Sequence, residues 1–274
     1  MGIWSSGNGG RSWTHIWPPA PSVVQAAAGG LAFGLAWTGG SRAVMESTGG
    51  GGAWTALASL PGSVSSIAAP DGRAVYALVT IGKSVELLAS RDGGARWSRR
   101  AAPPTPHPNG LSFPTAQTGF LYGANGTIYR TENGGQTWTR TGSTPAQSWF
   151  QPAVFTSSKD GWAVTGTRAL YATRDAGARW AVAGLAPGSG IAVSFANAAD
   201  GALLIGDTAA CAFPSRCTVS LLVTTDGGAH WSLRPLRGIE ATGVTMASST
   251  RIYVTTLDGA LVTTDGGATW SWAG

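Results

Sequence analysis

The sequence predicts an all-β protein, a β-propeller of four-stranded antiparallel blades, on the strength of three observations. First, the 274 residues include 41 Gly and 15 Pro, and one Gly inside a helix costs about 1 kcal/mol relative to Ala. Second, 13 residues are Trp and only 11% are charged, whereas an average domain has about 25% charged residues. Third, one eight-residue pattern recurs seven times. Together these features are typical of many short strands joined by tight turns.

The repeated pattern is Ser or Thr, any residue, Asp or a small substitute, any residue, Gly, two further residues and Trp. Its copies lie at 6–13, 47–54, 90–97, 131–138, 173–180, 224–231 and 263–270. They end at Trp13, Trp54, Trp97, Trp138, Trp180, Trp231 and Trp270, at intervals of 41, 43, 41, 42, 51 and 39 residues. A period near 40 residues indicates one propeller blade per repeat.

Each copy predicts a hairpin turn followed by a strand. The third residue accepts hydrogen bonds from backbone N–H groups of its own turn, and the Gly supplies the positive φ of a tight turn. The Trp begins the return strand, where burial of its ring contributes about 1.5–3 kcal/mol. Polar residues at the third position are Asn8, Asp92, Asn133, Asp175, Asp226 and Asp265, and Gly49 replaces them in the second copy.

Every unit has room for three more short strands. In one unit we expect strands at 153–156, 161–166, 169–173 and 180–184, and in the preceding unit at 111–114, 119–123, 127–131 and 138–142. Both faces of these strands are largely apolar. Such a unit is a blade whose two faces are covered by neighbouring blades.

The blade count leaves two interpretations open. The chain is expected to form a single domain over 1–274, with complete blades ending near residues 57, 100, 141, 184, 234 and 274. Residues 1–17 supply only the outer two strands of a half blade. Either six blades close the ring beside a peripheral hairpin, or the chain is a seven-bladed propeller truncated at its N-terminus. We favour the second because the chain starts in the middle of a repeat and shows no secretion signal.

The repeated turn resembles the Asp box, or bacterial neuraminidase repeat (BNR), of sialidases, xyloglucan-hydrolysing glycosidases, sortilin-type receptors and photosystem II stability/assembly factor-like proteins. The wider unit is most similar to the last family, and residues 153–180 match its pattern almost throughout. In these families the box is a folding element at the blade periphery. The resemblance therefore implies the fold, and it implies a protein-binding or assembly scaffold as the function.

Glycoside hydrolysis requires two carboxylates that flank the scissile bond. Most acidic residues fall in the predicted turns, and those that remain are Glu46, Glu86, Asp207 and Glu240. They lie in different units or at different strand positions, and the arginine-isoleucine-proline motif of sialidases does not occur. We therefore expect no catalytic residue and no cofactor.

The alternative is a carbohydrate-active propeller, a glycoside hydrolase or a glycan-binding module. Its candidate sugar platforms are Trp37, Trp149 and Trp162, for which packing between blades is the competing interpretation.

Composition excludes several other classes. His15, His107 and His230 lack the spacing of a metal site. The 18 basic and 13 acidic residues give a net charge of +5, but the bases are dispersed, so nucleic-acid binding is not expected. No stretch provides the roughly 20 apolar residues of a membrane span. We expect a monomer.

Cys211 and Cys217 bracket an insertion in the longest interval between repeats. A disulfide closing this short loop would contribute about 2–3 kcal/mol and would imply an oxidising compartment; a pair of reduced buried thiols is the alternative. The sequence thus predicts an extracytoplasmic, non-enzymatic propeller. Its expected contact surfaces are the loops at the ends of the central channel and the insertion at 208–218.

Overall fold

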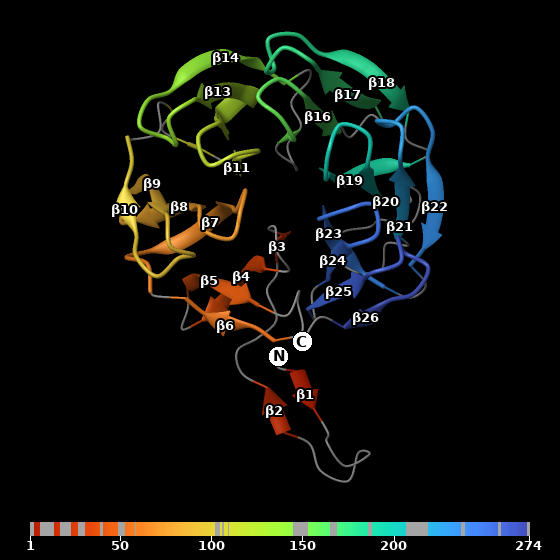
Figure 1. Ribbon diagram of the computed structural model, residues 1–274, viewed down its shortest axis with the longest axis horizontal. Coiled ribbons are helices and arrows are strands. Elements are labelled where there is room, and N and C mark those ends of the chain that lie inside the picture. The colour runs from red at the N-terminus through yellow and green to blue at the C-terminus, as the bar shows by residue number, and fades with distance from the viewer. Residues whose placement is uncertain are drawn as a thin grey trace.

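Six four-stranded sheets surround a central axis in the computed structural model (Figure 1). The structure describes residues 3–5, 14–16, 23–26, 31–38, 41–48, 53–57, 59–101, 105, 107–108, 110–144, 153–164, 169–185, 188–206, 219–236, 239–256 and 259–272. Each sheet takes its strands in chain order, and every neighbouring pair is antiparallel. The all-β propeller of four-stranded antiparallel blades is confirmed.

We number the blades in chain order and their strands from the axis outward. Blade 1 comprises β3 (Val23–Ala26), β4 (Ala32–Thr38), β5 (Ser41–Ser47) and β6 (Thr55–Ala56). Blade 2 comprises β7 (Ser63–Ala68), β8 (Val75–Ile81), β9 (Ser84–Ser90) and β10 (Ser98–Arg99). Blade 3 comprises β11 (Gly110–Ser112), β12 (Gly119–Tyr122), β13 (Thr127–Thr131) and β14 (Thr139–Ser143), with a short 3-10 turn, η2 (Ala124–Gly126), between its second and third strands.

The second half of the ring repeats this order. Blade 4 comprises β15 (Val154–Phe155), β16 (Gly161–Val164), β17 (Ala169–Thr173) and β18 (Ala181–Leu185). Blade 5 comprises β19 (Ser189–Phe195), β20 (Gly201–Gly206), β21 (Val219–Thr224) and β22 (Ser232–Pro235). Blade 6 comprises β23 (Ala241–Met246), β24 (Ile252–Thr256), β25 (Ala260–Thr263) and β26 (Ser271–Trp272).

Blade 6 closes the ring by packing directly on blade 1. Tyr253 and Ala260 of blade 6 share one apolar cluster with Val24 and Met45 of blade 1. The hydroxyl of Thr245 also donates a hydrogen bond to the carbonyl of Val24. The ring is therefore six-bladed.

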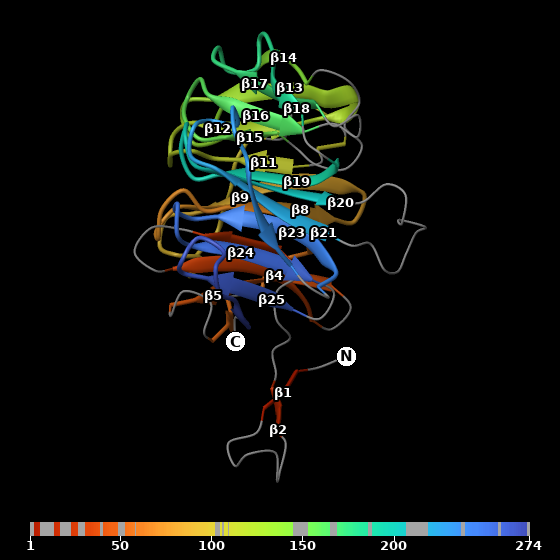
Figure 2. The same ribbon diagram turned by 90° about the vertical axis from the view of Figure 1, so that its right-hand side faces the viewer.

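The N-terminal strands form a separate two-stranded sheet. In it, β1 (Ile3–Ser5) pairs with β2 (Thr14–Ile16), so that Ile3 lies opposite Ile16. Both views show this hairpin outside the ring (Figures 1 and 2). The arrangement matches the interpretation with a peripheral hairpin. The half blade of a truncated seven-bladed propeller is not confirmed and stays a prediction.

Burial changes from the second strand to the fourth within a blade. All residues of β12, β16 and β20 are buried, whereas both residues of β10 and β26 are exposed. The second strands are covered on both faces because each blade packs between two others. This explains why they are continuous apolar runs instead of alternating ones.

Aromatic rings stack across three consecutive blade interfaces. Tyr76 stacks on Phe113 with ring centroids 3.7 Å apart, and Phe120 stacks on Phe155 at 3.6 Å. The third pair is Trp162 with Phe195, at 4.1 Å. In each pair, one ring comes from the second strand of a blade and the other is the Phe that ends or follows the first strand of the next. Each Phe also meets the Trp of its own repeated turn edge-on, at 6.1 to 6.4 Å.

A glycine makes room for each of these Phe rings. The Phe lies opposite the first residue of the second strand in its own blade, as in the Phe155–Gly161 and Phe195–Gly201 pairs. A Cβ on Gly119 would lie 2.3 Å from the ring of Phe113, one on Gly161 2.8 Å from Phe155, and one on Gly201 2.4 Å from Phe195. Any other residue would collide with the ring, so the Gly and the Phe are required together.

Hydroxyl groups on the innermost strands join neighbouring blades. The Oγ of Ser66 accepts a hydrogen bond from the N–H of Leu111 at 3.1 Å. The Oγ of Ser112 accepts one from Phe155 at 3.0 Å, and the Oγ of Ser194 one from Met246 at 2.9 Å. A backbone donor that no strand partner satisfies is thus paired across the interface.

Candidate functional site

The two ends of the ring differ in what they carry. At one end, which we call the repeat-turn face, the repeated turns between third and fourth strands lie beside the turns between first and second strands. Gly134 donates to the carbonyl of Gln117 at 2.8 Å and Gly227 to that of Ala199 at 2.8 Å, each within one blade. The opposite end, the hairpin face, carries the hairpins between second and third strands and the links between blades.

The repeated turns form the hydrogen-bond network that their sequence predicts. In blade 4, the hydroxyl of Thr173 donates to Asp175 at 2.9 Å and accepts from the N–H of Gly177 at 2.9 Å. Asp175 also accepts from the N–H of Arg179 at 2.8 Å. Blades 2, 3, 5 and 6 repeat this network around Asp92, Asn133, Asp226 and Asp265.

These hydrogen bonds lower the pKa of the turn carboxyls. The dominant cause is the backbone N–H of the residue before the Trp for Asp92, Asp175 and Asp226, and the hydroxyl of Thr263 for Asp265. A general acid in glycoside hydrolysis needs the opposite, a carboxyl whose pKa is raised. The turn carboxylates are therefore suited to holding turns and unsuited to donating protons.

The repeated turns also connect one blade to the next. Their carbonyl groups accept hydrogen bonds from the preceding blade, as when Ala101 donates to Gly135 at 3.2 Å. The indole N–H of Trp162 donates to Gly227 at 3.3 Å, and the Nε of Arg234 to Gly266 at 3.1 Å. The described turns thus form hydrogen bonds both within their own blade and to the preceding blade. Asn8, Trp13 and Gly49 lie outside the described residues, as does half of the second copy, of which Trp54 is described and buried.

The candidate acids are not brought together into a catalytic pair. Glu46 lies on β5 of blade 1, Glu86 on β9 of blade 2, and exposed Glu240 before β23 of blade 6. Glu86 is engaged in an ion pair with Arg99 of the adjacent strand, at 2.8 Å. Asp207 is outside the described residues. Within the described ranges no group of three or more His, Cys, Asp or Glu residues is placed to hold a metal ion.

Trp162, a candidate sugar platform, is instead part of a blade interface. Its side chain is fully buried, Phe195 stacks on it, and the guanidinium of Arg174 lies over the ring, 5.0 Å from the centroid. Trp149 lies outside the described residues, as do Cys211 and Cys217. Trp37 alone of the three candidates is seen at the surface.

Trp37 and its cross-strand partner Arg42 form an exposed pair on the hairpin face. Trp37 is 56% exposed, lies opposite Arg42 at the end of the β4–β5 hairpin, and has the Arg42 guanidinium 5.3 Å from its ring centroid. A cation over an indole ring is a favourable contact, worth about 0.5–1 kcal/mol at an exposed site.

This pair departs from the repeat. The corresponding cross-strand pairs are Thr80 with Val85 in blade 2 and Gly206 with Val219 in blade 5. An exposed aromatic ring and a cation thus stand where blades 2 and 5 have small or aliphatic side chains. Aligning the strands of the repeats singles out Trp37, whereas the contact of Arg42 with its ring is visible only in the structure. Trp37 and Arg42 form the candidate binding site.

Among the helices of the described residues, none is long and apolar enough to cross a membrane. A sequence profile described as photosynthesis system II assembly factor YCF48 matches residues 97–189, which span blades 3 and 4. No curated protein sequence matches the chain.

Solved structures that resemble the chain include YCF48 from Cyanidioschyzon merolae, with a TM-score of 0.60 and 15% identity over 98% of this chain and 89% of that one. They also include YCF48 bound to D1 peptide, with a TM-score of 0.56 and 14% identity over 90% of this chain and 93% of that one. The chain is a BNR-type β-propeller that resembles YCF48.

The fold is shared with hydrolases. The GH74 enzyme of Niastella koreensis matches with a TM-score of 0.59 and 16% identity over 91% of this chain, which spans 46% of the enzyme. At these identities the likeness shows the fold alone. Both YCF48 and a glycoside hydrolase resemble this chain, so similarity of fold does not decide whether the chain is an enzyme.

Proposed function

We propose that the chain is a non-enzymatic, extracytoplasmic BNR propeller that binds another protein and serves as an assembly scaffold. The observation that carries the proposal is the exposed pair of Trp37 and Arg42, placed where blades 2 and 5 have small or aliphatic residues. Trp and Arg are the residue types that contribute most binding energy at protein interfaces.

The placement of the acidic residues supports a role without hydrolysis. The described candidate acids lie on three blades, and one of them is neutralised by Arg99. The carboxyl pKa values that depart from their ordinary range do so downward. Neither feature suits the paired carboxyls of a glycosidase.

Similarity to YCF48 supports a protein as the partner. One of the matching structures is of YCF48 bound to D1 peptide, so this fold presents a polypeptide-binding surface in at least one relative. We propose the same class of ligand for this chain, without carrying over that peptide.

The proposed compartment rests on Cys211 and Cys217. A disulfide between them would place the chain where thiols are oxidised. Mass spectrometry after alkylation without reduction tests it: the exported protein should carry no label at either cysteine, and two labelled cysteines would contradict the proposal.

A carbohydrate-active propeller is the second candidate, and the exposed ring of Trp37 favours it, because sugars stack on such rings. The fold shared with GH74 enzymes is compatible with it, although this chain spans less than half of the Niastella enzyme.

One experiment separates the two functions. The tagged chain is cross-linked in the cell-envelope fraction of its source organism, and a captured protein is purified and mixed with the chain for size-exclusion chromatography with light scattering. In parallel, the chain is incubated with xyloglucan and sialyllactose. We expect a stable stoichiometric complex, a free chain that elutes as a monomer, and no released sugar. Sugar release without complex formation would overturn the proposal.

A further inference from the structure

The surface around Trp37 extends from blade 1 to blade 2. The N–H of Arg42 donates to the Oγ of Ser63, the first residue of β7, at 3.4 Å. Ser63 pairs with Thr80 at the end of β8, directly before the partly buried Ile81. We call this region the blade 1/2 corner, comprising the described residues among 36–43, 57–63 and 79–85.

The charge of the blade 1/2 corner has a single sign. Among its described residues the charged side chains are Arg42 and Lys83, and none is Asp, Glu, Asn or Gln. Arg42 takes part in no ion pair with a described carboxylate, in contrast to Arg99, Arg130 and Arg174. The acid that directly follows the corner, Glu86, is engaged by Arg99, so neither cation of the corner has a carboxylate partner among the described residues.

The Arg42 side chain is held before any ligand arrives. It is half-buried, its backbone is tied to blade 2 through Ser63, and its guanidinium stacks against Trp37. A guanidinium binds a carboxylate through paired hydrogen bonds, and fixing it in advance lowers the entropy cost of binding. A neighbouring apolar side chain of the ligand would cover the exposed part of the indole ring.

We propose that the blade 1/2 corner binds an extended polypeptide segment in which an Asp, Glu or terminal carboxylate stands beside an apolar side chain. The inference rests on the proposed function and names the chemistry of its ligand. Binding a sugar requires amide or carboxylate side chains around the ring that form hydrogen bonds with its hydroxyl groups. The described residues of the corner include no such side chain, which favours a peptide as the ligand.

The test begins with a defined probe. A library of random nine-residue peptides is selected against the immobilised full chain, and the most enriched peptide is synthesised with a fluorescent label. Its affinity is then measured by fluorescence anisotropy for the wild-type chain and for Trp37→Ala, Arg42→Gln and Lys83→Gln. Trp272→Ala is a matched control, because Trp272 is 57% exposed but lies on the outer strand of blade 6. Arg140→Gln, an exposed cation on the outer strand of blade 3, controls for loss of charge.

We expect enriched peptides to combine an acidic residue with an apolar neighbour. Trp37→Ala and Arg42→Gln should each weaken binding at least about tenfold, the loss typical of truncating a central interface residue. Lys83→Gln should weaken it less, and raised salt should reduce the wild-type affinity by screening. The two control variants should bind as the wild type does. Trp37→Phe should recover part of the affinity, which a misfolded variant would not.

Three results would overturn the inference: peptides without acidic enrichment, equal binding by all variants, or no selected peptide together with Trp37-dependent binding of polygalacturonate. The first two leave the proposed function standing if the captured protein still forms its complex. The proposed function itself is contradicted only if the chain releases sugar and forms no complex with a captured protein.

Discussion

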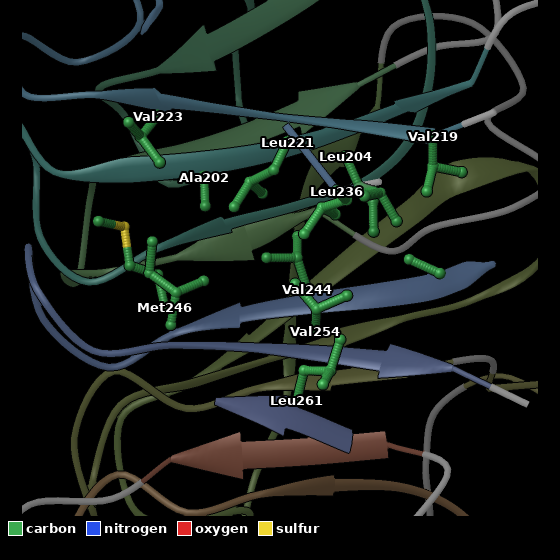
Figure 3. Packing of buried hydrophobic residues seen from close by; sticks show 13 residues of the cluster. Ala202, Leu204, Val219, Leu221, Val223, Leu236, Val244, Met246, Val254 and Leu261 are labelled. Carbon is green, nitrogen blue, oxygen red and sulfur yellow. The ribbon is translucent and has the colours of Figure 1, made fainter. Parts of the chain in front are cut away.

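Two neighbouring blade interfaces are packed with different side chains at corresponding positions. Between blades 4 and 5, Trp162 on the second strand stacks on Phe195. Between blades 5 and 6, the corresponding residues are Ala202 and Met246, which belong to a cluster of aliphatic residues (Figure 3). A large ring is thus replaced by a methyl group, and the Phe by a flexible aliphatic side chain.

The difference teaches which features of the repeat are obligatory. Where the first strand ends in Phe, a Gly lies opposite it, as in Phe195 and Gly201. Where it ends in Met246, the opposite residue is Ile252. The Gly is therefore required only where a Phe ring faces it, whereas Met246 leaves room for a β-branched side chain on the opposite strand.

The largest effect is expected at the aromatic interface. Trp162→Ala should lower the free energy of unfolding by about 3–5 kcal/mol, because it removes a fully buried ring and leaves a cavity. Urea denaturation followed by circular dichroism measures the loss. Trp272→Ala, on an exposed Trp, should stay within about 0.5 kcal/mol of the wild type. If Trp162→Ala cost no more than Trp272→Ala, the stacked pair would not support the interface.

The Phe–Gly requirement is tested by a double-mutant cycle. Gly119→Ala places a methyl group 2.3 Å from the Phe113 ring, which cannot retreat because Tyr76 stacks on it at 3.7 Å. We expect a loss of about 1–3 kcal/mol from overpacking. In a Phe113→Leu background the added cost of Gly119→Ala should shrink, as expected for residues in contact. If Gly119→Ala lowered the free energy of unfolding equally with Phe113 and with the Phe113→Leu substitution, the requirement for Gly119 would not come from the Phe ring.

Hydroxyl links should not distinguish the two kinds of interface. Ser112 and Ser194 accept hydrogen bonds from Phe155 at an aromatic interface and from Met246 at the aliphatic one. Replacing either Ser by Ala leaves a backbone N–H unpaired, at a cost of about 1–3 kcal/mol. Thermal unfolding of the two variants should give similar losses. A loss confined to one of them would show that the side chains around the bond decide its value.

Acid should weaken both interfaces together, because the same kind of turn lies beside each. Asp226 and Asp265 have lowered pKa values in the folded chain, so their stabilisation is present above the unfolded pKa of about 3.9 and is lost as the pH falls further. When the unfolding temperature is measured from pH 7 to pH 2, it should stay level down to about pH 4 and decrease at lower pH. The unfolding temperature of Asp226→Asn should decrease less steeply over the same range. Asn133 already serves in blade 3, which indicates that the amide is compatible with the turn. Parallel curves for both proteins would contradict the assignment.

The sequence was sufficient for the repeated turns and the strands, because both depend on local patterns. In blade 4 the expected strands at 161–166 and 169–173 correspond to β16 and β17. The pairing of Trp162 with Phe195 could not be predicted, since it depends on two blades meeting in a particular register. For the same reason Trp162 remained a candidate platform until its burial was known.

Only one of the two residues of the candidate site could be predicted from the sequence. Trp37 was among the candidate platforms, but Arg42 was not singled out, because nothing local indicates that it stacks on the ring. The choice between six and seven blades also needed the structure, since closure depends on contacts between Tyr253 of blade 6 and the blade 1 residues of the same cluster.

The central claim is that residues following the repeat build the scaffold and that Trp37 and Arg42, which depart from it, bind the partner. It is tested most directly by giving blade 1 the residues of blade 2, in the double variant Trp37→Thr and Arg42→Val. Unfolding temperature and affinity for the captured partner protein are measured on the same preparations. The account predicts an unchanged unfolding temperature and loss of binding by at least about tenfold. Retained binding, with or without a loss of stability, would contradict it.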